Sequence, residues 1–391
     1  MNTEHRIVIL GAGYTGMLAA VRLARRTRKQ HVRITLVNPS PRFTERLRMH
    51  QVAAGQELAD YRIDDILTGT GIQFVQGWAT SIDPAAGHVV VDRNRTLPYD
   101  DLVYALGSST DTSIVPGAAD HAWTLDNPRT ARHFADRLNA VAAQGGTLTV
   151  CGGGLTGIEA ATEIADSHPE LRVTLISVGA PGTMMGDKAR GYLNRTLDRL
   201  GIIREIGSAV TKVLPDAVEL SNGTIVSADM TLWTTGTRVA PLATQAGIET
   251  DARGLIVVDQ TLRSISHPNI HAVGDAAAVR MPWGQIHGTC QSGMPTAAYT
   301  ADTIARQLRG KTVRPFRFGY FHQPVSLGRR DGVIQFTRSD DTPGRCYLTG
   351  RLAAAYKESV SASPVPLFRF SRRMNVPVKL KAGRPATTQP A

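Results

Sequence analysis

The chain has 391 residues, of which 42% are hydrophobic and 20% are charged, and its formal net charge is +11. A chain of this length can form two or three domains with cores of their own. No apolar run approaches the roughly 18 residues that a membrane-spanning helix needs, and residues 1–6 lack the charged-then-apolar order of a signal peptide, so we expect a cytoplasmic protein. The positive charge comes without a recognition module or an aromatic-studded groove, so we do not expect nucleic acid as a partner.

The three cysteines, Cys151, Cys290 and Cys346, lie far apart in the sequence and form no C-x-x-C pair. This spacing argues against a redox disulfide and against a zinc site, so we predict no metal. We interpret the three residues as buried or inert thiols.

The chain begins with a strand that ends in a glycine-rich turn. Residues 7–10 form a short apolar run, and Met17 starts an apolar stripe with helical spacing. Gly11, Gly13 and Gly16 stand between them in the order G-x-G-x-x-G. Strand, turn and helix in this order are typical of a dinucleotide-binding fold, in which the helix N-terminus faces the pyrophosphate. We therefore predict cofactor contacts along the turn, at Gly11, Ala12, Gly13, Tyr14, Thr15 and Gly16.

A second strand is predicted at residues 32–37, and Asn38 follows it. A dinucleotide-binding fold usually places an acid at this point to bind the ribose hydroxyls. The amide oxygen of Asn38 can accept the same hydrogen bond without charge assistance, so we expect a weaker clamp. Further along, residues 80–92 are expected to form a hairpin, and residues 99–106 a strand that ends at Gly107.

The middle of the chain repeats the pattern. A helix with Phe134, Leu138 and Val141 on one face precedes a strand at residues 148–151 and a second glycine turn. The next strand, residues 173–176, ends at Ser177, where neither an acid nor an arginine is present to select NADH or NADPH. The coenzyme is therefore left open. The predicted contacts of this unit are Gly152, Gly154, Leu155, Thr156, Gly157, Ser177 and Gly236.

After a strand that ends at Gly236, we expect residues 255–258 and 269–275 to rebuild the first unit, followed by a helix over 294–309. The predicted fold is α/β, with two Rossmann-like dinucleotide-binding domains, one inserted in the other. Two nucleotide sites in one chain suggest a flavin, held permanently, and a nicotinamide that brings hydride. We predict an FAD-binding domain at 1–110 and 240–310, an NAD(P)H-binding domain at 111–239, and a small C-terminal region at 311–391.

The C-terminal region is predicted to contain strands at residues 325–327 and 333–336. From Ser361 the chain is rich in proline and basic residues, so we expect partial disorder, little buried surface and no long helix. Basic residues also crowd the first helix, and either group could lie on a solvated face or attract an anionic membrane surface weakly. The basic residues of the tail are Arg369, Arg372, Arg373, Lys379, Lys381 and Arg384.

Several motifs in this order resemble the two-dinucleotide-binding flavoproteins of the pyridine nucleotide-disulfide oxidoreductase superfamily, and within it the type II NADH dehydrogenases. The resemblance covers about residues 6–340 and rests on GAGYTG, YALGS, CGGGLTGIEAA, LWTTGT and AVGDAAA. It implies that Gly274 and Asp275 bind the flavin, although Asp275 could also be a helix N-cap. It adds Ala79, Ala105 and Gly107 to the cofactor contacts.

The resemblance also names two catalytic candidates. Glu159 matches a glutamate near the nicotinamide and the flavin, although a glutamate in the first turn of a helix also suits the dipole alone. Gln291 matches the first glutamine of the quinone-facing helix, whereas Pro295 and Thr296 replace a later pair of glutamines. His287, Cys290 and His322 of the same region are interpreted as structural.

We therefore predict an FAD-dependent NAD(P)H oxidoreductase that passes hydride from a nicotinamide to the flavin and then reduces a second acceptor. A quinone is one candidate acceptor. The alternatives are a ferredoxin-type reductase with a protein acceptor and a non-catalytic flavin-binding redox sensor. The tail lacks long amphipathic anchor helices, so only weak contact with the inner face of the membrane is considered, and a homodimer is left open.

Overall fold

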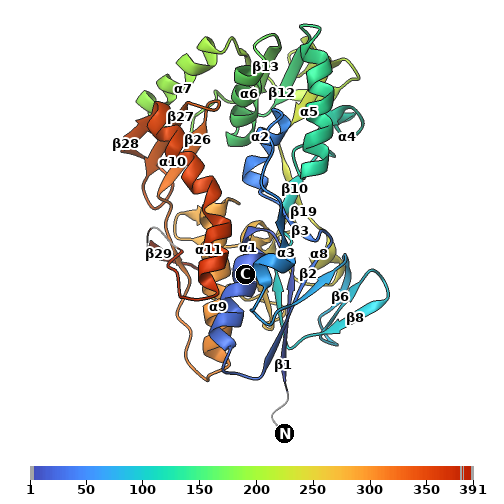
Figure 1. Cartoon of the computed structure of the whole chain (residues 1–391), viewed down its shortest axis with the longest axis vertical. Helices are drawn as coiled ribbons and strands as arrows, with labels where there is room; N and C mark the ends of the chain where they lie inside the picture. Colours follow the sequence, from blue (N-terminus) through green and yellow to red (C-terminus); the bar gives the residue numbers. More distant parts are fainter. Residues whose placement is uncertain (1–3, 379–380, 382, 389–391) are drawn as a thin grey trace.

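The computed structural model describes residues 4–378, 381 and 383–388. Lys379, which we counted among the basic residues of the tail, and the chain ends at 1–3 and 389–391 lie outside the described residues. Figure 1 shows an elongated molecule in which the blue and orange elements of the first unit and the green elements of the second are stacked along the long axis.

The first fold is built on a parallel sheet of five strands. Its order is β21 (Ile270–Ala272), β9 (Asp101–Tyr104), β1 (His5–Leu10), β2 (Val32–Asn38) and β5 (Gln73–Gln76). Alternate residues of β1 face different layers, as the period of a strand requires. Ile7 and Ile9 pack with α1 (Tyr14–Thr27) and α9 (Cys290–Gln307), whereas Val8 and Leu10 pack with the antiparallel sheet of β6 (Ala79–Asp83), β7 (His88–Val91) and β8 (Arg95–Pro98).

The second fold repeats this plan. Its parallel sheet has the order β11 (Ala122–Trp123), β18 (Met230–Trp233), β12 (Thr147–Cys151), β13 (Arg172–Ser177) and β14 (Ile203–Ile206). The predicted α/β class with two dinucleotide-binding folds is thus confirmed. Its helices are α5 (Pro128–Ala142), α6 (Leu155–Ser167) and α7 (Asp187–Arg199), and its second layer is formed by β15 (Val210–Val213), β16 (Ala217–Leu220) and β17 (Ile225–Ser227).

Two connections between the folds pair with each other. The chain leaves the first fold along β10 (Ser108–Thr110) and returns along β19 (Thr237–Val239), and the two strands are antiparallel. A short helix of the early chain, α2 (Met49–Ala53), also reaches the second fold, where Met49, Val52 and Ala53 pack in the core with α5 and α6. In Figure 1 this blue helix lies among the green ones.

The C-terminal region contains strands where we predicted them, near residues 325–327 and 333–336, and it is also folded after Ser361, where we expected partial disorder. It contains an antiparallel sheet of β26 (His322–Ser326), β27 (Gly332–Thr337) and β28 (Pro343–Thr349), and two helices, α10 (Gly350–Ala362) and α11 (Pro364–Ser371). Pro364 is the first residue of α11, where the missing N–H of proline costs no hydrogen bond. Val365 and Phe368 are buried against α1, so the prediction of a tail that buries little surface is wrong.

The basic residues of the first helix also differ from our expectation. Arg22 is 8% exposed; it pairs with Asp302 at 2.8 Å and donates to the carbonyl oxygen of Val376 at 2.7 Å. Arg26 pairs with the same Asp302 at 2.7 Å. These arginines therefore hold α1, α9 and the C-terminal segment together and are not simply a solvated face.

The shorter elements complete the fold. They are β3 (Arg42–Phe43) with β4 (Tyr61–Arg62), η1 (Arg46–Arg48), α3 (Ile63–Leu67), α4 (Ala118–His121), α8 (Leu242–Gln245), β20 (Ile256–Val257) with β22 (Ala277–Ala278), η2 (Gly274–Ala276), β23 (Arg280–Met281) with β24 (Gly284–Gln285), and β25 (Arg317–Phe318) with β29 (Arg384–Pro385). In the part of the chain that the structure describes, no helix combines the length and the apolar character needed to cross a bilayer.

Candidate functional site

The three glycines of the first turn each meet a different steric demand. Gly11 has φ +94°, and a Cβ there would lie 2.5 Å from the carbonyl oxygen of Ala105. A Cβ on Gly16 would collide with the carbonyl oxygen of Gly11, whereas a Cβ on Gly13 would meet no atom within 4 Å. No side chain caps the N-terminus of α1 at Gly13. Open space beside uncapped N–H groups suits a pyrophosphate.

Asn38 lies at the end of β2, beside this turn. Its Oδ1 accepts a hydrogen bond from the backbone N–H of Ala12 at 2.9 Å, and its Nδ2 donates to the carbonyl oxygen of Ser40 at 2.9 Å. The amide oxygen, which we expected to face a ribose hydroxyl, therefore already holds the glycine turn. One of its two lone pairs remains for a ligand.

Asp275 lies within η2, whose N-cap is Val273. The interpretation of Asp275 as a helix N-cap is therefore wrong. Its Oδ2 accepts a hydrogen bond from the Ser108 hydroxyl at 2.8 Å, so the carboxylate is oriented by the connection between the two folds. The preceding residue, Gly274, has φ +67° and donates its N–H to Thr296 Oγ1 at 3.0 Å. Thr296, which replaces an expected glutamine, thus supports this turn.

The second glycine turn has the same geometry as the first. Gly152 has φ +125°, a Cβ on Gly157 would collide with the carbonyl oxygen of Gly152, and a Cβ on Gly154 would meet nothing within 4 Å. No side chain caps α6 at Gly154. Ser177, at the end of β13, donates its hydroxyl to the carbonyl oxygen of Gly179 at 2.5 Å. This turn therefore also leaves room for a phosphate group.

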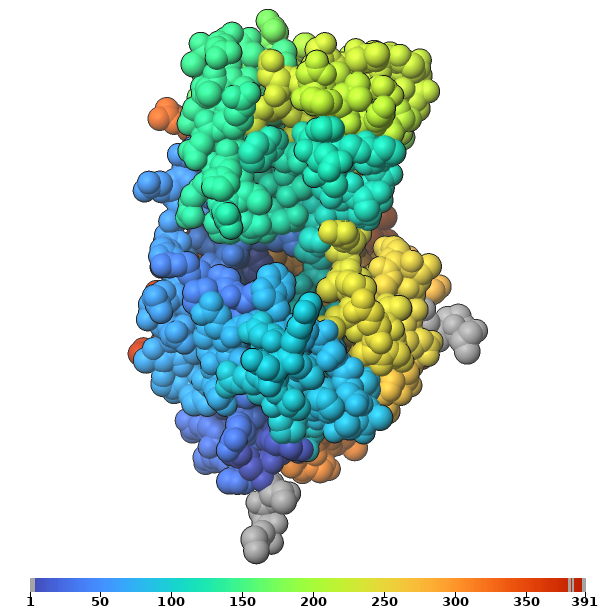
Figure 2. Space-filling view, turned by 90° about the vertical axis from the view of Figure 1, so that its right-hand side faces the viewer, coloured from blue at the N-terminus to red at the C-terminus, as the bar shows by residue number. Residues whose placement is uncertain are grey.

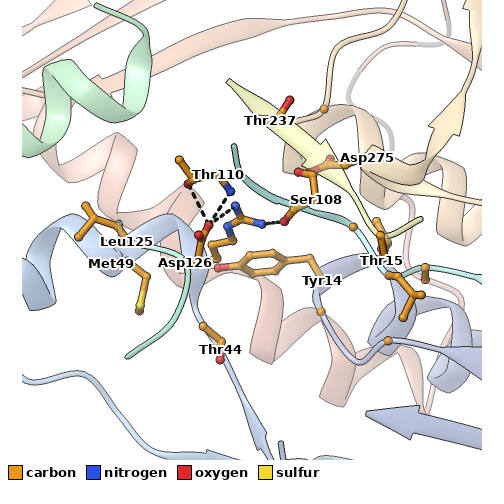
Figure 3. A pocket seen from close by; sticks show the side chains of 18 of the residues that line it. Tyr14, Thr15, Thr44, Met49, Ser108, Thr110, Leu125, Asp126, Thr237 and Asp275 are labelled. Carbon is orange, nitrogen blue, oxygen red and sulfur yellow. Dashed lines mark hydrogen bonds and ion pairs between the residues drawn. The ribbon is translucent and has the colours of Figure 1, made fainter. Parts of the chain in front are cut away.

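A cavity of about 570 Å³ lies between the two folds. Figure 2 shows the surface hollowed along the boundary between the blue and the green parts of the chain, and Figure 3 shows the cavity from close by. The predicted residues that line it are Gly11, Gly13, Tyr14, Thr15, Asn38, Ala79, Ala105, Gly107, Thr156, Glu159, Gly236 and Asp275. The remaining predicted contacts lie behind this wall or along the second turn: Ala12, Gly16, Gly152, Gly154, Leu155, Gly157, Ser177 and Gly274.

Arg46 and Asp126 form an ion pair in this cavity that the sequence did not indicate. Arg46 Nη2 lies 3.0 Å from Asp126 Oδ1, which also accepts hydrogen bonds from the backbone N–H and the hydroxyl of Thr110, at 3.0 and 2.9 Å. Arg46 donates in addition to the carbonyl oxygen of Ser108. Figure 3 shows Thr110 and Ser108 beside Asp126. The pair joins the two folds across the cavity, and no sequence motif links residues 80 positions apart.

Glu159 lies at the meeting point of four elements. Its Oε1 is 2.8 Å from Lys357 Nζ on α10 and accepts the N–H of Ser326 on β26 at 3.0 Å. Its Oε2 is 4.0 Å from His50 Nδ1 on α2. Burial raises the pKa of Glu159, but Lys357 and His50 outweigh burial and hold the pKa below its usual value. The same burial lowers the pKa of His50 to about 4. Glu159 and His50 line the cavity as a buried carboxylate beside a neutral imidazole, and Lys357, which does not line it, pairs with the carboxylate.

Gln291 connects two elements. Its Oε1 accepts the N–H of Phe321 at 2.9 Å, and its Nε2 donates to the carbonyl oxygen of His322 at 2.9 Å, which ties α9 to β26. Gln291 therefore joins two elements of the fold. It follows Cys290, which lines the cavity, but is not itself among the lining residues.

The other polar residues of this region have partners of their own. His322 Nδ1 lies 2.6 Å from the Tyr356 hydroxyl, and His287 Nε2 lies 3.1 Å from Asp341 Oδ2. The three cysteines are free. Cys290 lines the cavity, and burial raises the pKa of its thiol to about 12. Cys346 is exposed on β28, so only its inertness, which stays a prediction, would fit the interpretation of buried or inert thiols.

Comparison with known proteins identifies related chains. The sequence model of the family described as pyridine nucleotide-disulphide oxidoreductase matches residues 5–302. An NADH dehydrogenase-like protein of Mycobacterium tuberculosis is 29% identical over 351 residues, which cover 84% of this chain and 87% of that protein. The type II NADH:quinone oxidoreductase of Staphylococcus epidermidis is 28% identical over 365 residues, which cover 84% and 89%.

Two solved structures share the fold. The sulfide:quinone oxidoreductase of Aquifex aeolicus has a TM-score of 0.82 at 19% identity, and the match covers 94% of this chain and 92% of that one. NDH2 of Plasmodium falciparum, solved in complex with NADH, has a TM-score of 0.80 at 16% identity, with coverage of 95% and 97%.

Proposed function

The chain belongs to the pyridine nucleotide-disulphide oxidoreductase family, and from that premise we propose that it transfers electrons from NADH through FAD to a quinone. The oxidoreductase class and the cofactors FAD and NADH follow from the family and its relatives. One observation carries the proposal: the same cavity is lined by the first glycine turn and by Thr156 and Glu159 of the second fold. Nucleotides held by the two turns can therefore meet in one space.

The quinone is the acceptor that the relatives support. Two features of this chain's cysteines favour a quinone over a thiol-based route. The first is that Cys290, which lines the cavity, remains a protonated thiol. The second is that, among the described residues, no cysteine is paired with another, so there is no disulfide to receive electrons. The type II NADH:quinone oxidoreductase named above matches this chain over 89% of its own length.

In this proposal, the residues of the chain bind FAD and NADH, orient them and shield them. Bound FAD supplies a carrier that accepts hydride from a nicotinamide and passes electrons on. The first turn, with Gly11 and Gly13, would hold its pyrophosphate, and Asp275 would accept hydrogen bonds from hydroxyl groups. The second turn would hold the pyrophosphate of NADH. Glu159 at the cavity wall is held by its pair with Lys357, so little reorganisation of this charge is needed when electrons move in the cavity.

A two-step stopped-flow experiment tests the proposal. Mixing the purified protein with NADH should bleach the flavin absorbance, and a water-soluble quinone added next should restore it through many turnovers. NADPH, a ferredoxin and oxygen serve as comparison reactants. Rapid reoxidation by ferredoxin with none by quinone would replace the quinone with a protein acceptor. Bleaching without turnover by any acceptor would contradict an enzyme and favour a redox sensor.

We also infer that the protein is cytoplasmic and meets its quinone at the inner face of the membrane. Exposed apolar side chains lie near arginines on the C-terminal elements, among them Tyr347, Leu352, Phe370 and Met374. Together with a net charge of +11, they suit an anionic surface. Salt-sensitive sedimentation with anionic vesicles would support this location, and its absence at low salt would contradict it. A homodimer stays a prediction, which a mass measurement by light scattering would check.

A further inference from the structure

Trp78 is an exposed tryptophan that lines the cavity. It follows β5 by two residues, and 68% of its surface is accessible. Its neighbours in the cavity wall include Asn38, Pro39 and Ala79. Burial of a large apolar side chain normally stabilises a protein, so a tryptophan left in water at the edge of a cavity is available to cover a ligand.

The backbone that carries Trp78 is fixed on both sides. The N–H of Trp78 donates to Asp92 Oδ1 at 2.9 Å, and its carbonyl oxygen accepts the N–H of Asp92 at 2.9 Å. The preceding Gly77 donates its N–H to the carbonyl oxygen of Asn38 at 3.0 Å. A Cβ on Gly77 would collide with the side chain of Val91, so the chain lies tightly against β7. The backbone at Trp78 is therefore held before a ligand binds, so only the side chain has to be ordered, which limits the entropy cost of binding.

The position of Trp78 in the sheet relates it to one part of a dinucleotide. β5 is the strand next to β2, and Gln76 pairs with Asn38, so the two strands end at the same level. In a dinucleotide-binding fold the pyrophosphate lies at the glycine turn, and the ribose of the adenosine half lies at the end of the second strand. The base beyond that ribose must lie farther along the same edge. Trp78 is the aromatic residue at that end of the cavity lining.

We propose that Trp78 stacks on the adenine ring of FAD and closes the adenosine end of the site. Stacking suits this role because every base has a π-face and needs no matched hydrogen bonds. Trp78 is then a positioning residue, which acts on the end of the cofactor remote from the reacting ring. The proposal rests on the assignment of FAD to the first glycine turn.

The test compares holoproteins that carry Trp78→Ala, Trp78→Phe or Leu352→Ala. Leu352 is 71% exposed on α10 and serves as the matched control, since it is an equally accessible apolar residue outside the cavity lining. After dilution, released FAD is followed by its fluorescence. We expect Trp78→Ala to weaken FAD binding roughly tenfold, within the range of base–aromatic stacking. Trp78→Phe should retain most of the affinity, and Leu352→Ala should match the unmodified protein.

A second readout reports stacking directly. Excess ADP is added to the diluted proteins after FAD release, and tryptophan emission is recorded. ADP carries no flavin to accept the excitation energy, so quenching that is present in the unmodified protein and absent in Trp78→Phe would show that this ring meets the adenine. Unchanged FAD affinity in Trp78→Ala, or equal quenching by ADP in Trp78→Phe, would overturn the proposal. If Gly13→Val also keeps its FAD, the first-turn assignment itself has failed; if Gly13→Val loses FAD, the failure belongs to Trp78 alone.

Discussion

The two glycine turns have nearly the same backbone and very different surroundings. In both, the first glycine has a positive φ, the middle glycine faces open space and the last glycine packs against the first. Gly11 and Gly13 line the cavity between the folds, whereas the second fold contributes Thr156 and Glu159 to that lining in place of its turn glycines. We infer that the turn motif provides a phosphate site in each fold, and that the enclosure around it distinguishes a retained cofactor from a coenzyme that exchanges.

The helices behind the two turns are also supported differently. α1 packs against α9 and α11, and an aromatic series of Tyr14, Phe43 and Phe368 connects α11 to the first turn, with ring centroids 5.2 and 5.3 Å apart. α6 is supported by the buried pair of Glu159 and Lys357 and by His50. Both helices combine apolar packing with ion pairs, but aromatic rings reach the first turn, whereas a buried ion pair lies at the start of α6 beside the second turn. Mutations in each turn, and in the residues that support it, test this contrast.

The largest effect on flavin content is expected from Gly13→Val. No atom lies within 4 Å of a Cβ at this position, so the protein should fold, but the valine side chain would fill the space that suits a pyrophosphate. We expect FAD affinity to fall by about 100-fold or more, which corresponds to roughly 3 kcal/mol, and the purified protein to be colourless. Flavin absorbance per protein measures this. A yellow protein with full flavin would show that the first turn does not hold FAD.

Gly154→Val is the matched change in the second turn, where a Cβ also meets no atom within 4 Å. Because we assign this turn to NADH, the variant should keep its FAD and show a KM for NADH raised by about tenfold, or roughly 1.4 kcal/mol. Steady-state kinetics with the flavin content measured on the same sample provide the test. Loss of FAD with normal reduction by NADH would reverse the two assignments.

Phe368→Ala tests the apolar support of the first turn. Phe368 is fully buried, and truncation of a buried phenylalanine costs about 3–5 kcal/mol. Phe370, two residues further, is 56% exposed, so Phe370→Ala should change stability by no more than about 0.5 kcal/mol. Chemical denaturation measures both. Because Phe368 reaches Tyr14 through Phe43, the first variant should also release FAD faster; equal stability of the two variants would remove α11 from the support of this turn.

The packing of α11 against the first fold changes what we expect of a truncated protein. On the sequence alone, removal of the chain after Val360 should leave FAD content nearly unchanged. The structure places Val365 and Phe368 in the core of the first fold, so this truncation is now expected to destabilise that fold. Flavin content and the melting temperature of the shortened protein decide between the two expectations.

Local patterns in the sequence were sufficient for the strands and the glycine turns, because an apolar run before G-x-G-x-x-G has few other structures open to it. They failed for the C-terminal segment, since its composition resembles that of a disordered tail. What orders it is distant in sequence: the apolar face of α1 and the contact of Arg22 with Val376. The candidate site shows the same limit: contacts between residues distant in sequence could not be predicted.

Glu159 could be selected from its place after the second turn, whereas its partners could not. His50, Ser326 and Lys357 come from three other elements and belong to no motif. Trp78 was missed for a similar reason, because its relation to Asn38 follows from the pairing of β2 with β5. Residues that meet only through sheet order or helix packing need the fold before they can be recognised.

A further effect is expected from acid, which acts on the support of α6. Burial lowers the pKa of His50 from 6.5 to about 4, so between these pH values the unfolded chain binds a proton that the folded chain does not. The unfolded state then gains stability as the pH falls, and at pH 5 the contribution of His50 is a loss of about 2 kcal/mol relative to pH 7. His322, whose pKa burial also lowers to about 4, acts in the same direction. Burial raises the pKa of Glu163 to about 7, so this group opposes them over the same range.

Because the contributions of His50, His322 and Glu163 to the pH dependence of stability partly cancel, the pH dependence must be compared between variants. The free energy of unfolding should fall less from pH 7 to pH 5 in His50→Asn than in the unmodified protein, by about 2 kcal/mol. His133→Asn, at an exposed position of α5, is the control and should follow the unmodified protein. Asp302, which pairs with Arg22 beside α1, has a pKa below its usual value of 3.8 and stays ionised throughout this range, so the support of the first turn should not respond. An identical pH dependence in His50→Asn and His133→Asn would show that His50 is not held neutral beside Glu159.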